Sequence, residues 1–308
     1  MTADPDTQLT TPLTSQLTTP AGTFTALVGG PADGELVVLL HGFPQTRHTW
    51  RAQVPALAEA GFRAVAPDQR GYSPGARPDP ADPAAYHVAH LVTDVVAVAD
   101  AARAGPPEGT AGGRGTERFH LVGHDWGGAV AWLTATRHAD RLASLTVLSR
   151  PHPRAFGRAF RADGDGQQHR SRHHRAFLDP GTGPKLLEDG GRRLRRTLRE
   201  ARVPDAHVEE YLSVLADPPA LEAALDWYRA ASGDLTAMDA PVVTVPTLYL
   251  WGDEDASVGA DAARGTGDFV TGPYRFEVLA GVGHFATDEQ PERVTALLVE
   301  HLRAHPVV

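Results

Sequence analysis

Short apolar runs alternate with longer stretches of helically spaced apolar positions along most of the chain. Apolar runs that end at turns predict buried strands, and apolar positions about three or four apart predict amphipathic helices. We predict strands at residues 15–18, 23–28, 36–40, 119–122 and 142–148, with others in "FRAVAPDQRG", "PTLYLWGDED" and "YRFEVLAGVGH". Helices are predicted at residues 50–60, 87–102, 126–137 and 291–304.

The order of these elements indicates the fold class. Strands and helices follow one another with short connections, which favours an α/β fold: a mostly parallel sheet covered by helices on both faces. The alternation stops at residues 150–241, which are polar, rich in arginine and histidine, and mostly helical in pattern. We therefore predict a core in two parts, residues 1–149 and 242–308, with an inserted helical cap at 150–241. The Gly-rich stretch 105–117 is predicted as a surface loop.

The composition limits the classes of function that are expected for this chain. The 308 residues are 42% hydrophobic and 22% charged, as in ordinary globular proteins. No run of about 18 apolar residues predicts a membrane span, and the N-terminus lacks the pattern of a signal peptide. Cysteine is absent, which excludes disulfides and favours a cytoplasmic location. The net charge of −9 argues against nucleic-acid binding. We expect a small-molecule substrate, no metal or cofactor, and a monomer or homodimer.

The stretch "HLVGHDWGGAVAW" carries the first candidate for chemistry. Its Gly-x-Asp-x-Gly frame, centred on Asp125, matches the strand-to-helix turn that presents a hydrolase nucleophile. A tight turn without catalytic function would give the same frame. A carboxylate is suited to displacement at saturated carbon, where it forms an ester to the substrate. Asp125 is therefore the candidate nucleophile.

Three further elements end predicted strands: "HGFP" (41–44), "WGDED" (251–255) and "GVGHF" (281–285). The carboxyl ends of parallel strands form the ligand-binding edge of such a sheet. The chain order of nucleophile, acid and histidine is that of the α/β-hydrolase triad. We predict that His284 takes a proton from water, which attacks the ester, and that an acid within residues 253–255 orients this histidine.

From about residue 15 onward the chain resembles the α/β-hydrolase fold. Its "HGFP" and "GHDWGG" motifs resemble those of epoxide hydrolases and of haloalkane and fluoroacetate dehalogenases. The resemblance implies that Asp255, in a Gly-x-x-Asp placement, is the acid of the triad, with Asp253 and Glu254 as alternatives. It also implies that the N–H groups of Phe43 and Trp126 bind an oxyanion on the nucleophile and that both residues contact the substrate. The same motif implies a cis bond before Pro44.

The cap carries the residues that would separate these relatives. Epoxide hydrolases use two cap tyrosines as proton donors, and Tyr228 in "LDWYRAA" resembles one of them. The position of the other, in "RSRHHRAFLDPG", appears in this chain as His173. Histidine also donates hydrogen bonds, so a Tyr228–His173 donor pair is predicted. Their neighbours Trp227 and His174 are predicted to contact the substrate.

Two other functions stay open. Fluoroacetate dehalogenases use a cap histidine and tyrosine but place arginines directly after the nucleophile, where this chain has Trp126 and Gly127. Haloalkane dehalogenases share that tryptophan but have asparagine in place of Phe43. We therefore favour epoxide hydrolysis, with haloalkane or haloacid dehalogenation as the alternative. A non-catalytic ligand-binding protein is the second alternative.

Weaker signals are interpreted as structural. The basic stretch 191–202 is predicted as a solvated cap helix rather than a binding surface. His169 and His173 would share a helical face, but with Asp165 they are not predicted to bind metal. Asp68 and Arg70, in "DQRGYSPG", are predicted to support the site.

Overall fold

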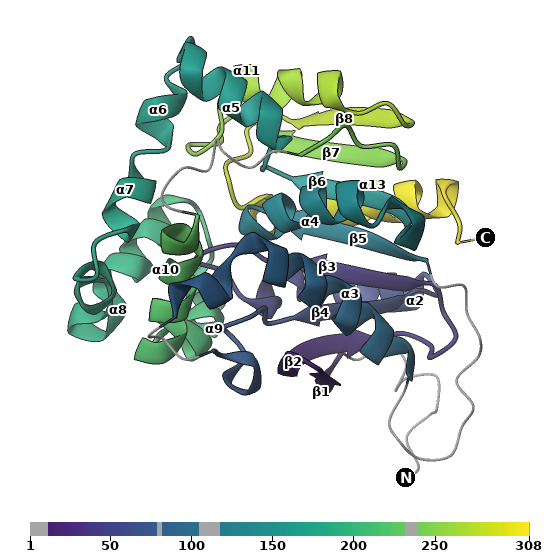
Figure 1. Cartoon of the computed structure of the whole chain (residues 1–308), viewed down its shortest axis with the longest axis horizontal. Coiled ribbons are helices and arrows are strands. Elements are labelled where there is room, and N and C mark those ends of the chain that lie inside the picture. Colours follow the sequence, from purple (N-terminus) through teal and green to yellow (C-terminus); the bar gives the residue numbers. More distant parts are fainter. Residues whose placement is uncertain (1–11, 79–81, 105–117, 232–239, 308) are drawn as a thin grey trace.

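A single eight-stranded sheet organises the computed structural model, which describes residues 12–78, 82–104, 118–231 and 240–307 (Figure 1). The strands are β1 (Leu13–Thr19), β2 (Gly22–Gly29), β3 (Leu36–Leu40), β4 (Arg63–Pro67), β5 (Phe119–His124), β6 (Leu142–Leu148), β7 (Thr247–Gly252) and β8 (Tyr274–Leu279). Their order is β1-β2-β4-β3-β5-β6-β7-β8. β2 pairs antiparallel with β1 and β4, and the pairings from β4 to β8 are parallel. The predicted mostly parallel sheet is confirmed.

Helices cover both faces of this sheet. They are α2 (Gln53–Glu59), α3 (Val88–Ala104), α4 (Trp126–Arg137), α11 (Ala260–Arg264), α12 (Ala286–Glu289) and α13 (Pro291–Ala304), with 3-10 turns η1 (Arg47–Trp50), η2 (Pro74–Ala76), η3 (Pro83–Tyr86), η4 (Ala139–Arg141) and η5 (Gly265–Phe269). Successive side chains of β3 point to opposite faces. Val37 and Leu39 join the apolar cluster that contains α2 and α13, whereas Val38 and Leu40 join the cluster that contains α3 and α4.

The described residues between β6 and β7 form the helices predicted for the cap. These are α5 (Pro153–Ala162), α6 (Gln167–Arg170), α7 (His173–Phe177), α8 (Thr182–Glu200), α9 (Asp205–Leu215) and α10 (Pro218–Ala230). α5 packs against α11 and η5 of the core, whereas α7 to α10 pack on one another at one end of the sheet (Figure 1). Residues 188–191 interrupt α8, because their backbone leaves the helical region.

Most predicted elements match the structure closely. The strands at 36–40 and 142–148 and the helices at 126–137 and 291–304 have the predicted bounds. The helix predicted at 50–60 is instead the short η1 followed by α2, with a break at residues 51–52. The stretch 105–117, predicted as a loop, lies outside the described residues.

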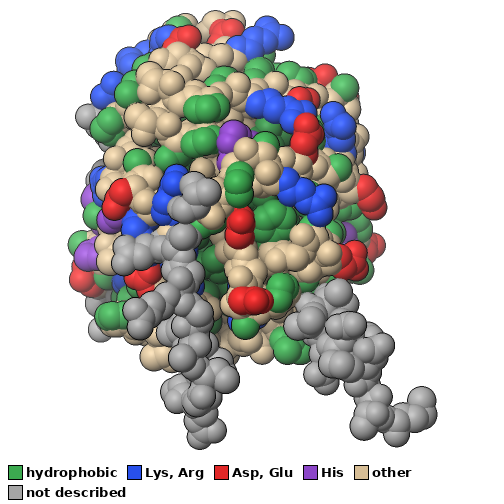
Figure 2. Space-filling view, turned by 90° about the vertical axis from the view of Figure 1, so that its right-hand side faces the viewer, with side chains coloured by type: hydrophobic (Ala, Val, Ile, Leu, Met, Phe, Trp, Pro, Cys, Tyr) green, Lys and Arg blue, Asp and Glu red, His purple; other side chains and the backbone are tan. Residues whose placement is uncertain are grey.

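Charged side chains are interspersed on the described surface. Figure 2 shows the end of the molecule opposite the cap, where acidic and basic groups alternate. Most arginines of the basic stretch 191–202 form ion pairs, including Arg192 with Asp189 at 2.7 Å and Arg199 with Asp205 at 2.6 Å. These pairs support the prediction of a solvated cap helix. Within the described residues, no helix is both long and apolar enough to cross a membrane.

Candidate active site

Asp125 occupies a sharp turn between β5 and α4. Its backbone has φ 51° and ψ −117°, a conformation that costs a residue with a side chain about 1–3 kcal/mol. The flanking glycines are required by space: a Cβ at Gly123 would lie 2.3 Å from the Gly127 carbonyl oxygen, and one at Gly127 would lie 2.4 Å from that of Leu40. The Gly-x-Asp-x-Gly frame therefore forms the predicted strand-to-helix turn.

Two groups contact the carboxylate of Asp125. The backbone N–H of Phe43 donates to Oδ1 at 3.0 Å, and Nε2 of His284 lies 3.7 Å from Oδ2. Gly42 permits the first contact, because a Cβ there would lie 2.4 Å from Oδ1. Of the two predicted oxyanion donors, Phe43 already contacts the carboxylate. No hydrogen bond from the Trp126 N–H to it is present in the described residues.

His41 stabilises the loop that contains Phe43 through hydrogen bonds. Burial lowers the pKa of His41 to about 4, so its imidazole is neutral at physiological pH. Its Nδ1 donates to the Gly42 carbonyl at 3.0 Å, and its Nε2 accepts from the N–H of Gln69 at 3.2 Å. The Phe43–Pro44 peptide bond is cis, as the resemblance implied.

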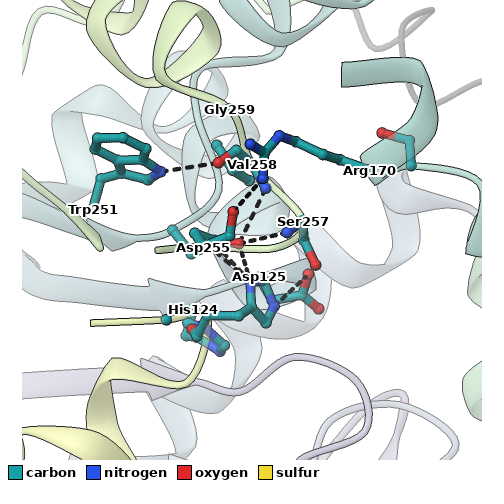
Figure 3. A network of polar contacts seen from close by, with 12 residues as sticks. His124, Asp125, Arg170, Trp251, Asp255, Ser257, Val258 and Gly259 are labelled. Atoms are coloured by element: carbon teal, nitrogen blue, oxygen red, sulfur yellow. Dashed lines mark hydrogen bonds and ion pairs between the residues drawn. The ribbon is translucent and has the colours of Figure 1, made fainter. Parts of the chain in front are cut away.

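Asp255 is the acid that contacts His284. Both of its carboxylate oxygens lie 3.1 Å from Nδ1 of His284. The backbone N–H groups of Ser257 and Val258 donate to its Oδ1 at 2.7 and 3.1 Å (Figure 3). Arg170, from the cap helix α6, donates to the carbonyl oxygen of Asp255 at 2.7 Å. These contacts favour Asp255 over its neighbours 253 and 254 as the acid.

The electrostatics of these three residues favour a charged histidine in the free protein. Burial opposes ionisation of Asp125 and Asp255, but the hydrogen bonds and charge of His284 outweigh it and lower the pKa of both carboxyls. Burial likewise opposes a charged His284, but the two carboxylates outweigh it and raise the pKa to about 10. At neutral pH the site therefore holds two carboxylates and one imidazolium.

Ser149 is a site residue that the sequence analysis missed. It follows β6 with a left-handed φ of 63°. Its hydroxyl donates to Oδ2 of Asp255 at 2.7 Å, and its oxygen lies 3.0 Å from Nδ1 of His284. The sequence carries a signal for it, because "LSRPHP" follows a predicted strand at the ligand-binding edge of the sheet.

A cavity of about 700 Å³ opens above these residues, between the core and the cap. Asp125 and His284 line it from the core, together with Phe43, Pro44 and Phe285. The cap contributes His173 and Tyr228, together with apolar and polar residues of α7 and α8. The structure thus brings five of the sequence-predicted residues, Phe43, Asp125, His173, Tyr228 and His284, to one cavity.

Tyr228 lies in an aromatic wall of this cavity. Its side chain is buried, and its ring centroid lies 5.1 Å from that of Trp126, 4.8 Å from that of Phe177 and 6.0 Å from that of Phe43. Burial, with the nearby charge of Asp125, raises the pKa of Tyr228 well above its ordinary value. The hydroxyl therefore keeps its proton at physiological pH and is available as a donor.

The two cap histidines are neutral at physiological pH, and the tautomer of His173 decides whether it can donate a hydrogen bond to a substrate. Burial is the largest cause that lowers the pKa of His173 and of His174. Nδ1 of His173 lies 3.1 Å from the carbonyl oxygen of Arg170, which accepts only, so Nδ1 carries the proton. A neutral imidazole has one N–H, which leaves Nε2 of His173 as an acceptor. His173 can donate to a substrate from Nε2 only in its protonated form.

Known proteins are similar to this chain over most of its length. A family model described as the alpha/beta hydrolase family matches residues 37–297. This chain belongs to the α/β-hydrolase family. It is 31% identical to epoxide hydrolase A of Mycobacterium tuberculosis, with 89% of this chain and 92% of that protein covered. It is 30% identical to epoxide hydrolase 3 of Xenopus tropicalis, with 91% and 74% covered.

A solved structure shows the same likeness in three dimensions. The crystal structure of epoxide hydrolase A from Mycobacterium thermoresistibile matches this α/β-hydrolase with a TM-score of 0.78 at 27% sequence identity. The match covers 97% of this chain and 100% of that one.

Trp227 lies behind the cavity wall of this α/β-hydrolase rather than in it. Its indole N–H donates to the carbonyl oxygen of Arg70 at 3.1 Å, and its ring packs against those of Tyr72 and Trp126. Trp126, His174 and Trp227, all predicted to contact substrate, are not among the residues that line the cavity. The sequence places each beside a lining residue, but adjacent helical positions point in different directions.

The remaining sequence signals have structural roles in this α/β-hydrolase. Arg70 pairs with Asp94 through two hydrogen bonds of 2.6 and 2.7 Å, and Asp68 accepts from the backbone N–H of Arg47 at 2.8 Å. His169 and His173 lie on the separate helices α6 and α7, so the shared helical face considered for them does not form.

Proposed function

We propose that this α/β-hydrolase is an epoxide hydrolase, which opens an epoxide to a vicinal diol through an ester on Asp125. The observation that carries the proposal is one cavity lined by an aspartate nucleophile, His284 and the protonated Tyr228. The relatives named epoxide hydrolases support the same reaction class.

The first half-reaction uses the two oxygens of Asp125 differently. Because Oδ1 accepts the Phe43 N–H, Oδ2 is the oxygen that attacks the epoxide carbon. A bond forms from this carbon to Oδ2 while the carbon–oxygen bond of the ring breaks. The hydroxyl of Tyr228 gives its proton to the departing oxygen. The product of this step is a hydroxyalkyl ester of Asp125, with Oδ1 as its carbonyl oxygen.

Ester formation itself converts His284 into a base. The carboxylate of Asp125 is one of the groups that raise the pKa of His284 to about 10. Esterification removes that negative charge, so the pKa of His284 falls. His284 then releases its proton, which returns to the oxygen of Tyr228. Asp255 keeps the neutral ring oriented through Nδ1.

The second half-reaction hydrolyses the ester. Neutral His284 takes a proton from water, and the resulting hydroxide attacks the carbonyl carbon of esterified Asp125. Negative charge develops on Oδ1, which accepts a hydrogen bond from the Phe43 N–H. The backbone N–H of Trp126, the residue after Asp125, is the second candidate donor to this oxygen. Collapse breaks the bond to the alkyl oxygen, which takes the proton from His284. The second proton of the water then passes from the new carboxyl group of Asp125 to His284. The diol leaves, and Asp125 is again a carboxylate beside a protonated His284.

Intact-protein mass spectrometry on His284→Gln tests this proposal. The variant is expected to form the ester and to stall before hydrolysis. With an aryl epoxide, the protein mass should rise by the whole mass of the substrate. The double variant Asp125→Asn, His284→Gln is the control and should not be labelled.

The dehalogenase alternative predicts a different adduct. Haloalkanes or haloacids would give a mass increase equal to the substrate minus hydrogen halide. A halide also favours weak N–H donors, and the indole N–H of Trp227 is engaged by the Arg70 carbonyl. If neither class of substrate labels the His284→Gln variant, ligand binding without catalysis becomes the better description.

A further inference from the structure

Arg150 is a buried cation directly after the site residue Ser149. Only 6% of it is exposed, and its Nε and Nη2 are covered and have no hydrogen-bond partner. Within the described residues, no carboxylate forms an ion pair with its guanidinium. The contact it makes is with an aromatic ring: Cζ lies 4.2 Å from the ring centroid of Phe156, on cap helix α5.

Other arginines with a covered, unpartnered nitrogen differ from Arg150 in one respect. Each of them donates through another nitrogen to a carboxylate or carbonyl oxygen. The pairs are Arg47 with Asp68, Arg51 with Asp288, Arg63 with the Gly30 carbonyl, Arg170 with the Asp255 carbonyl, and Arg229 with Asp226. Arg150 therefore differs from these described arginines.

Arg150 lies beside the nucleophile turn. A Cβ on Gly128, three residues after Asp125, would lie 2.9 Å from the Cβ of Arg150. Burial is the largest cause that lowers the pKa of Arg150, and the charge of Asp125 opposes it. The charge of Arg150 is in turn among the causes that lower the pKa of His173. Asp125 and His173 line the cavity, whereas Arg150 itself is not among the lining residues.

A lone charge in this position has a high free-energy cost. Arginine does not lose its proton in proteins, and contact with an aromatic ring offsets only a small part of the cost of burying it. Asp125 is the nearby anion, but its carboxylate contacts the Phe43 N–H and His284 rather than Arg150. In the proposed ester, Asp125 is neutral, so Arg150 would then lack even this distant anion. A ligand carboxylate would give the covered N–H groups of Arg150 the hydrogen-bond partners that the described residues do not supply.

We propose that Arg150 is the anion-binding residue of this active site and that the substrates are epoxides carrying a carboxylate near the ring. The inference rests on the proposed function. Nε and Nη2 form the edge of a guanidinium that holds a carboxylate through two parallel hydrogen bonds. Arg70 uses that edge on Asp94 in this protein. Because the same edge of Arg150 is covered, binding involves movement of a neighbouring cap side chain.

The experiment compares two substrates of one shape and different charge: 3-phenyloxirane-2-carboxylate and its primary amide. Wild-type protein is expected to use the acid with at least a 10-fold higher kcat/KM than the amide. Arg150→Met should lower kcat/KM for the acid by about 10- to 100-fold, mainly through KM, and change that for the amide less than 3-fold. Arg150→Lys should retain part of the preference for the acid, because lysine keeps the positive charge but cannot form the two parallel hydrogen bonds.

Arg172 provides the competing explanation, because it lines the cavity and is exposed at its surface. A preference for the acid that is lost in Arg172→Met and kept in Arg150→Met overturns the assignment. Equal use of acid and amide by the wild-type protein also overturns it. Arg161→Met, on the exposed surface of α5, controls for removal of a cap arginine. Thermal unfolding of each variant shows whether it is folded.

A binding measurement separates this inference from the proposed function. Cinnamate and cinnamamide have the same outline as the two substrates but no epoxide to react. Calorimetry should show at least 10-fold tighter binding of cinnamate to the wild-type protein and loss of that difference in Arg150→Met. If these results appear without turnover of any epoxide, the anion site stands and the proposed chemistry fails. If the neutral amide is turned over and cinnamate has no advantage, the chemistry stands and the anion site is refuted.

Discussion

The hydroxyl of Ser149 donates to Oδ2 of Asp255 at 2.7 Å, while its oxygen lies 3.0 Å from Nδ1 of His284. Nδ1–H of the imidazole therefore faces three oxygens, two from the carboxylate and one from the serine. This arrangement restricts rotation of the ring and keeps Nε2 directed toward Asp125. Ser149 is thus a positioning residue between the acid and the base.

We predict that Ser149→Ala slows ester hydrolysis by about 10-fold. Loss of a hydrogen bond to a charged group costs about 1.5 kcal/mol or more, and about 1.4 kcal/mol corresponds to a factor of 10 in rate. The alkylation half-reaction does not use His284 as a base and should change less than 3-fold. Rapid mixing with mass detection of the ester measures both steps. Equal slowing of both would argue against a role through His284.

We predict that Asp125→Asn lowers the pKa of His284 from about 10 toward its ordinary value. Burial opposes the charged imidazole, and the carboxylates of Asp255 and Asp125 outweigh it. Removal of one carboxylate therefore weakens the stabilisation of the charged imidazole and lowers its pKa. NMR titration of the His284 ring nitrogens, assigned with His284→Gln, gives both values. The proposed mechanism requires the same decrease in the pKa of His284 when Asp125 is esterified. An unchanged pKa of His284 in Asp125→Asn would contradict the mechanism.

The raised pKa of His284 also predicts how stability depends on pH. A group whose pKa is higher in the folded state stabilises fully below its unfolded pKa and loses that contribution as pH rises through the folded value. For His284 the window runs from 6.5 to about 10. Urea unfolding should show that the wild-type protein loses stability over this window relative to His284→Gln. A difference in stability that does not change between pH 6.5 and 10 would show that the folded protein holds His284 neutral.

Sequence reasoning was most successful where local rules decide the structure. The turn at Asp125 is dictated by glycines that leave room for backbone atoms, so its frame is visible in the sequence. The parallel sheet likewise follows from apolar runs that are buried on both faces. Asp255 could be separated from residues 253 and 254 only through a family resemblance, because their contacts with His284 depend on packing.

Long-range contacts account for what was missed. Ser149 and Arg150 follow a predicted strand. The partner of Ser149, Asp255, is 106 residues away in the sequence. Among the described residues, Nε and Nη2 of Arg150 have no hydrogen-bond partner. Trp227 was expected in the cavity because it adjoins Tyr228, yet the rotation of α10 directs it toward Arg70. The sequence supplies the residues, and the packing of cap on core decides which of them meet.

A buried carboxylate, Asp288, joins the cap to the core and gives a stability prediction. Four side chains donate to it: Gln45, Arg51, His207 and Tyr211, each at 2.8 or 2.9 Å. Asp288→Asn removes the charge that these donors share, and we expect a loss of about 3–5 kcal/mol in the free energy of unfolding at pH 7. Urea denaturation measures it, with the exposed Glu292→Gln as a control expected within about 0.5 kcal/mol of wild type.

The effect of Asp288→Asn should shrink in acid. Burial opposes ionisation of Asp288, but His207, Arg51 and Tyr211 outweigh it and lower its pKa below 3.8. A depressed pKa stabilises above the unfolded value and loses that contribution as pH falls through the folded one. The difference between wild type and Asp288→Asn should therefore narrow below about pH 4. A difference that stays constant there would mean that packing, rather than charge, holds this cluster.

Tyr228 and His173 are predicted to contribute unequally to ring opening. Tyr228 keeps its proton until an alkoxide forms, so Tyr228→Phe should slow alkylation of Asp125 by about 10²-fold or more and leave ester hydrolysis nearly unchanged. His173→Gln should slow alkylation less than 10-fold at pH 8, because the neutral imidazole gives its N–H to the Arg170 carbonyl. Single-turnover rates of ester formation between pH 5 and pH 9 measure both. If His173→Gln matched Tyr228→Phe, and wild-type alkylation fell as His173 lost its proton, a cationic His173 would be the second donor.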